Sequence, residues 1–116
     1  MLVGVPIPGT LDVASLGSSA ELKDRYQLGA EVTGAVGCAW AAEWVDATGA
    51  GDDARAEAAA SAMATSHDWP ILREMSEQGA WSQVFWMVAD GMAGNGRTED
   101  GAPIAEFYPP ALGCEG

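Results

Sequence analysis

Small and apolar residues recur at every third or fourth position along most of the chain, which is the period of helices that bury one face. The longest stripe of this kind predicts a first helix over residues 20–47, with Ser18 or Ser19 as its cap. For most of its length the spacing of its members alternates between four and three: Leu22, Tyr26, Gly29, Thr33, Val36, Trp40, Trp44 and Ala47. We expect Gly29 and Gly37 to let another backbone approach this helix closely.

An uncharged run, residues 32–42, lies inside this helix between Glu31 and Glu43. A bilayer span takes about 20 apolar residues, so the run indicates a helical segment buried within a protein rather than a membrane segment. On a helical wheel Cys38 lies nearly opposite Trp40, so the back of the helix must be covered as well. We expect the C-terminal tail to cover it.

The second helical pattern is rich in alanine, so the side chains on its predicted inward face are small. It predicts a helix over about residues 54–65, following a glycine-containing turn. We expect Gly49 to end the first helix and either Asp52 or Asp53 to cap the second. The small side chains on its face would allow tight packing against a larger neighbour.

Two further helices follow. A short third helix is predicted with Pro70 in its first turn, Asp68 as its cap and Gly79 at its end. A fourth is predicted over residues 81–93, because its apolar positions follow the helical period closely. Its predicted inward face is Trp81, Val84, Phe85, Val88 and Met92.

The rest of the chain shows no alternating pattern typical of strands. Residues 104–108 predict a single helical turn, which Pro109 and Pro110 should stop. We therefore predict an all-α fold, a small four-helix bundle-like domain with a long central first helix and a C-terminal tail packed back on it. Residues 1–17 are expected to form an irregular N-terminal linker and residues 18–116 a single helical domain.

The charge narrows the possible partners. The chain of 116 residues carries a net charge of −12, with 17 acidic residues against five lysines and arginines. Such a chain repels phosphate, so nucleic acids and anionic membrane surfaces are disfavoured as partners. A basic protein, a cationic peptide or a metal ion is compatible with the charge, although solubility alone would also account for it.

The two cysteines, Cys38 and Cys114, either form a disulfide or are free thiols of a cytosolic protein. A cysteine near a chain end is best explained by a disulfide that holds the tail against the rest of the protein. Such a bond would close a loop of about 75 residues and stabilise the fold by roughly 4 kcal/mol. A disulfide would imply an oxidising, extracytoplasmic compartment. Residues 1–10 lack the pattern of a signal peptide. If the protein is extracytoplasmic, we expect a leader or an N-terminal anchor to have preceded them.

The sequence contains no recognisable catalytic or metal-binding constellation. His67 is the only histidine, and its neighbours Ser66 and Asp68 do not make a triad, because triad members converge in space rather than in sequence. Cys38 has no cationic neighbour that would activate it. Four polar residues around a glycine-rich loop resemble a calcium loop only superficially, since their spacing does not match one: Asp90, Asn95, Glu99 and Asp100. We expect no metal, no cofactor and no enzymatic activity.

The tryptophans offer the best candidate for a binding surface. Trp86 and Met87 lie off the inward stripe of the fourth helix, with Asp90 one turn further on. Either Trp86 packs beneath the tail or against Trp69, or it is an exposed anchor for a basic partner. The candidate partner-binding residues are Trp86, Met87, Asp90 and Trp69.

These observations favour a non-enzymatic, extracytoplasmic protein-interaction domain, secreted or membrane-tethered, and stabilised by a Cys38–Cys114 disulfide. The alternative is a cytosolic acidic decoy, a nucleic-acid mimic that binds a basic protein. A mimic should carry carboxylates at near-phosphate spacing, whereas residues 32–42 and the alanine-rich helix are bare. The oligomeric state and the identity of the partner are left open by the sequence.

Overall fold

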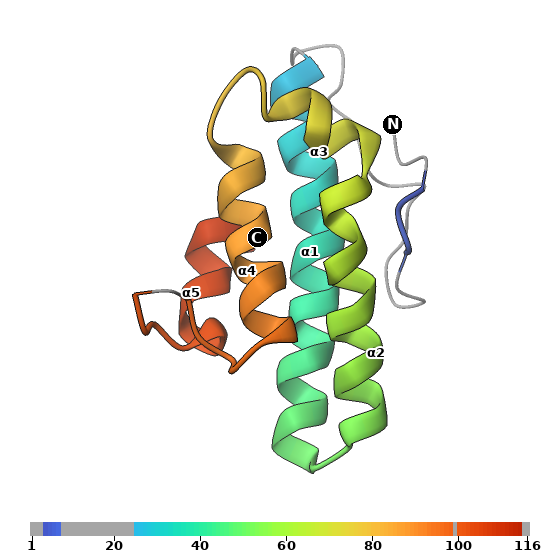
Figure 1. The fold of residues 1–116 in the computed structure, drawn as a ribbon, viewed down its shortest axis with the longest axis vertical. Helices are drawn as coiled ribbons and strands as arrows, with labels where there is room; N and C mark the ends of the chain where they lie inside the picture. Colours follow the sequence, from blue (N-terminus) through green and yellow to red (C-terminus); the bar gives the residue numbers. More distant parts are fainter. Residues whose placement is uncertain (1–3, 8–24, 99, 115–116) are drawn as a thin grey trace.

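The computed structural model of the protein describes residues 4–7, 25–98 and 100–114. Within these residues the chain forms helices and no strand, so the predicted all-α fold is confirmed. The longest helix runs through the centre of the molecule, and the alanine-rich helix that follows it lies on the side opposite to the last helix (Figure 1). The elements are α1 (Arg25–Ala50), α2 (Asp53–Ala64), the 3-10 turn η3 (Thr65–Asp68), α3 (Pro70–Met75), α4 (Trp81–Ala93) and α5 (Ile104–Leu112).

The turn between α1 and α2 lies slightly later than predicted. Gly49 is still helical, and the chain reverses at Gly51, whose φ of +74° is the left-handed conformation that glycine adopts without strain. Asp52 then caps α2, and its carboxylate accepts a hydrogen bond from the backbone N–H of Arg55 at 3.1 Å. The prediction that Gly49 ends the first helix was therefore wrong, and the acidic cap was correct.

The third helix is shorter than its pattern suggested. Asp68 belongs to η3 rather than capping α3, and Trp69 takes the cap position in an extended conformation before Pro70. The helix ends at Met75 instead of running to Gly79. A proline restricts the residue before it to extended conformations, which explains why the backbone breaks at Trp69.

The core lies between α1, α2 and α4, and α5 closes it (Figure 1). Segment 32–42 of α1 is mostly buried, as predicted, and no helix among the described residues is long and apolar enough to span a membrane. Residues 4–7, part of the predicted linker, pack onto this body. The indole N–H of Trp40 donates to the Pro6 carbonyl at 3.0 Å. The largest buried side chains are Trp69, Phe85, Met63, Ile71, Leu72, Met75 and Ile104.

The predicted contacts at the glycines of α1 need correction. Gly29 faces the side chain of Met75, and Gly37 faces the ring of Phe85, so neither admits a backbone. The close backbone approach occurs at Gly34, where an added Cβ would lie 3.0 Å from the carbonyl oxygen of Leu112. Gly29 and Gly37 thus make room for large side chains, and Gly34 makes room for the end of α5.

Replacing Gly37 by alanine is expected to destabilise the protein by about 1 to 3 kcal/mol. The new Cβ would lie 2.6 Å from Cε2 of Phe85 and 3.1 Å from Cδ1 of Leu112, and this overlap outweighs the gain of about 1 kcal/mol in helix propensity. Gly49→Ala in the same helix is the control, because nothing lies within 4 Å of its added Cβ. Urea denaturation should find Gly49→Ala neutral or slightly stabilised. Equal stability of the two variants would contradict the proposed packing.

The last helix continues through two prolines. The prediction that Pro109 and Pro110 would stop it was wrong, because both lie inside Ile104–Leu112. The φ angle of proline fits a helix, and the cost is the loss of two N–H donors to the carbonyls of Ala105 and Glu106. Both of these residues are exposed, so water can hydrate the carbonyls. The first and last residues of the helix are buried, which holds it against the body.

The C-terminal tail packs back on α1, as predicted. Cys114 follows α5 and forms a disulfide with Cys38 in the middle of α1, with the two Cα atoms 5.7 Å apart. Both cysteines are half-buried. The bond therefore fastens the covering helix to the back of the central one.

Candidate functional site

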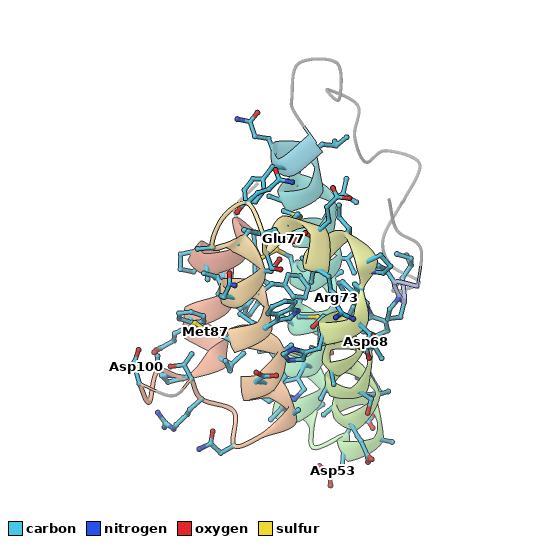
Figure 2. All side chains as sticks on the ribbon, turned by 45° about the horizontal axis from the view of Figure 1, so that its top comes forward. Asp53, Asp68, Arg73, Glu77, Met87 and Asp100 are labelled. Carbon is cyan, nitrogen blue, oxygen red and sulfur yellow. A yellow bond between two sulfur atoms is a disulfide. The ribbon has the colours of Figure 1, made fainter. Side chains whose placement is uncertain are left out.

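The outward side of α4 carries three of the four residues predicted to bind a partner. Trp86 and Met87 are half-buried there, and Asp90 is exposed. Met87 lies on the side of α4 that faces the 94–103 loop, near Asp100 (Figure 2). Trp86 borders η3 and α3. The helical period thus separates Trp86 and Met87 to the two edges of the outward face.

Trp86 is held in place by η3. Its indole N–H donates to the carbonyl oxygen of Ser66 at 3.0 Å. The ring stacks on the imidazole of His67, with centroids 5.1 Å apart and planes inclined by 19°. Trp86 also packs against the buried core, so its ring is partly covered on the inner side.

His67 completes a cluster that the sequence did not predict. Its Nε2 lies 2.7 Å from Oδ1 of Asp90, and the two side chains are 47% and 65% exposed. The residues are far apart in sequence and share no local pattern, so only the docking of η3 against α4 brings them together. We call His67, Trp86 and Asp90 the α4 cluster.

Two cavities flank the α4 cluster. The larger, of about 620 Å³, is called here the α3–α4 groove, and its residues come from η3, α3 and the turn after it, and α4: His67, Asp68, Arg73, Glu74, Ser76, Glu77 and Trp86. The smaller, of about 410 Å³, lies between α4 and the following loop and is lined by Met87, Asp90, Gly91, Asn95, Arg97, Thr98 and Asp100. Asp90 pairs with His67 on one side and lines the smaller cavity on the other.

Trp69 does not belong to this surface. It is only 1% exposed, its ring packs against Phe85 with centroids 5.3 Å apart, and its N–H donates to Oγ1 of Thr65 at 2.9 Å. The extended backbone before Pro70 directs this side chain inward. The prediction that Trp69 helps to bind a partner is therefore corrected: it is a core residue.

The His67–Asp90 pair does not extend to a hydrolytic triad. The hydroxyl of Ser66 is buried and makes no hydrogen bond to a described residue, so this neighbouring serine is not joined to the imidazole. Of the calcium-like loop residues, Glu99 lies outside the described part. The side chain of Asn95 accepts a hydrogen bond from the backbone N–H of Arg97 at 3.1 Å. The described residues contain no group of three His, Cys, Asp or Glu side chains arranged to hold a metal.

A second charged cluster joins α1 to α2. Arg55 donates to Glu43 at 2.7 Å and to Asp46 at 2.9 Å, and the Arg55 and Glu43 side chains are 41% and 39% exposed. The hydrogen bond from Arg55 lowers the pKa of Glu43 below its ordinary value, and the two carboxylates raise the pKa of Arg55. The positive charge of Arg55 is thus balanced by carboxylates of the same helical hairpin. It does not reduce the negative charge of the rest of the surface.

Comparison with protein-family models, curated proteins and solved structures finds no match to this chain. No family motif can therefore be carried over to the α4 cluster. Its role has to be inferred from the geometry and charge of its own residues.

Proposed function

We propose that the protein is a non-enzymatic, extracytoplasmic interaction domain, secreted or tethered to a membrane, which binds a basic partner protein through the outward side of α4. The observation that carries the proposal is the α4 cluster, in which a surface tryptophan is fixed by a hydrogen bond and by ring stacking. Tryptophan is enriched among the residues that contribute most of the binding energy at protein interfaces. An anchor that is already ordered loses little side-chain entropy on binding.

The charge supports a basic partner. The chain has a net charge of −12, and the α3–α4 groove beside Trp86 contains three carboxylates and a single guanidinium. Complementary charge accelerates encounter with a basic surface and disfavours acidic competitors. Nucleic acid would be repelled by the same field.

The disulfide supports the compartment. The Cys38–Cys114 bond fastens α5 to α1, and bonds of this kind persist outside the reducing cytoplasm. Alkylation of the protein in freshly lysed native cells, without reduction, should leave both cysteines unmodified. Two alkylated cysteines would overturn the compartment and favour the cytosolic acidic decoy instead.

The interface is tested by site-specific photo-cross-linking in native cells. A photoreactive residue in place of Met87, at the edge of the α4 surface, should form a discrete adduct with one partner protein. The same residue in place of Ala58, exposed on α2, is the control and should give no such adduct. Absence of the adduct at Met87, or the same adduct at both positions, would overturn the proposal.

A further inference from the structure

We infer that the α3–α4 groove receives one arginine side chain from an exposed basic segment of the partner. This inference rests on the proposed function and names the chemistry of recognition. Its support is the juxtaposition, within one cavity, of an ordered aromatic wall and several carboxylates.

The carboxylates set the charge of the occupant. Asp68, Glu74 and Glu77 line the groove, and Arg73 is the only lysine or arginine among its lining residues. In Figure 2, Asp68, Arg73 and Glu77 lie along the same side of the molecule. A guanidinium can pair with a carboxylate through two parallel hydrogen bonds, which a lysine ammonium cannot do. Arg73 opposes a second cation, so we expect one basic side chain rather than a run of them.

The aromatic wall sets its shape. The only hydrogen-bond donor of the Trp86 indole is already directed to the Ser66 carbonyl, so the indole offers aromatic surface to the groove. The imidazole of His67 lies parallel to this ring and is kept there by Asp90. A planar guanidinium packs well against aromatic rings, and nearby carboxylates strengthen its binding.

The size of the groove agrees with such an occupant. It is a surface depression, more open than enclosed, with a volume of about 620 Å³. It therefore has room for one long side chain together with the backbone that carries it. The walls come from α3 and α4, which are anchored in the core through Leu72 and Phe85, so the site exists before binding.

The test uses two short peptides and the full chain. One peptide carries a single arginine flanked by glycines, and the other carries citrulline, its neutral isostere, at the same position. In NMR titrations the arginine peptide should shift the indole N–H resonance of Trp86, and the citrulline peptide should bind about 10-fold more weakly, because it lacks the charge-assisted hydrogen bonds. Equal binding of the two peptides would overturn the inference.

Two matched variants separate the groove from the overall charge. Glu77→Gln removes a groove carboxylate and should weaken the arginine peptide several-fold. Glu57→Gln makes the same chemical change on the exposed side of α2, away from the groove, and should leave binding unchanged. Equal weakening by both variants would mean that the net charge, rather than the groove, attracts the peptide, and would overturn the inference.

The outcomes distinguish this inference from the function on which it rests. If the Met87 cross-link forms but the peptides fail to bind or to discriminate, the groove is wrong and the interaction domain stands. If the peptides discriminate but no cross-link forms, the groove binds arginine and the proposed interface on α4 falls. Matching thermal melts of the variants and the parent chain will show that each variant is folded.

Discussion

Replacing Cys38 and Cys114 together by alanine is expected to lower the free energy of unfolding by about 4 kcal/mol. The two residues are 76 positions apart, so the bond restricts most of the unfolded chain. A loss of this size is a large share of the roughly 5 to 15 kcal/mol that stabilises a typical domain. Urea denaturation of the variant and the parent chain measures the difference.

The local loss of stability should be greatest in α5, because Pro109 and Pro110 leave this helix with fewer internal hydrogen bonds than its length allows. Hydrogen exchange should therefore speed up first at residues 111–114, before it does in α1. Chemical reduction of the disulfide in the parent chain should have the same effect. A reductant can reach the bond, because Cys38 and Cys114 line a surface cavity of about 320 Å³. A double variant within about 1 kcal/mol of the parent would show that Ile104 and Leu112 hold the helix without the bond.

The best sequence predictions were those made where one strong local pattern acts without competition. The fourth helix was predicted over residues 81–93 and is observed at Trp81–Ala93, because its apolar positions repeat regularly and polar residues and glycines flank it. The inward face was less accurate. Trp81 and Val84 are only half-buried, while Ser82 and Ala89 are fully buried against the neighbouring helices. The period of apolar residues predicts which side of a helix faces inward. The helices packed against it determine which residues at the edges of that side are buried.

The errors arose where tertiary contacts override local rules. Pro109 and Pro110 are poor residues for a helix interior, yet the burial of Ile104 and Leu112 and the adjacent disulfide keep α5 helical. Gly37 gave no indication that it would face Phe85, because the partner comes from another helix. Such contacts are determined by how the helices dock, which a single sequence does not specify.

The candidate site divides in the same way. The outward position of Trp86, Met87 and Asp90 follows from the helical period of α4, so the sequence could predict it. The contribution of His67 and the inward turn of Trp69 could not be predicted. Both depend on η3, a single 3-10 turn whose conformation is set by its packing between α2 and α4.

This turn links the core to the surface. Trp69, which follows η3, points into the core, and His67, within η3, points out toward Asp90. The Ser66 carbonyl, also in η3, orients the indole of Trp86. The buried Trp69 therefore stabilises the position of Trp86 through η3. A substitution at Trp69 should change the conformation of the α4 cluster.

Trp69→Ala is expected to destabilise the protein by about 3 to 5 kcal/mol, because it removes a fully buried ring that packs on Phe85 together with the hydrogen bond from the indole to Oγ1 of Thr65. Trp86→Ala, at a half-buried position, should cost only about 1 to 2 kcal/mol. The milder Trp69→Phe keeps an aromatic ring and loses the hydrogen bond, at about 1 kcal/mol. Urea denaturation ranks the three variants.

The same variants test the link between core and surface. In the folded Trp69→Phe protein, the NMR resonances of the His67 ring and the Trp86 indole should shift, because the substitution removes the hydrogen bond from the Trp69 indole to Thr65 at the start of η3. The control is Gly49→Ala at the far end of α1, which should leave both resonances unchanged. Unshifted resonances in Trp69→Phe would show that η3 holds the α4 cluster independently of the core. A decrease of less than about 1 kcal/mol in the unfolding free energy of Trp69→Ala would show the same.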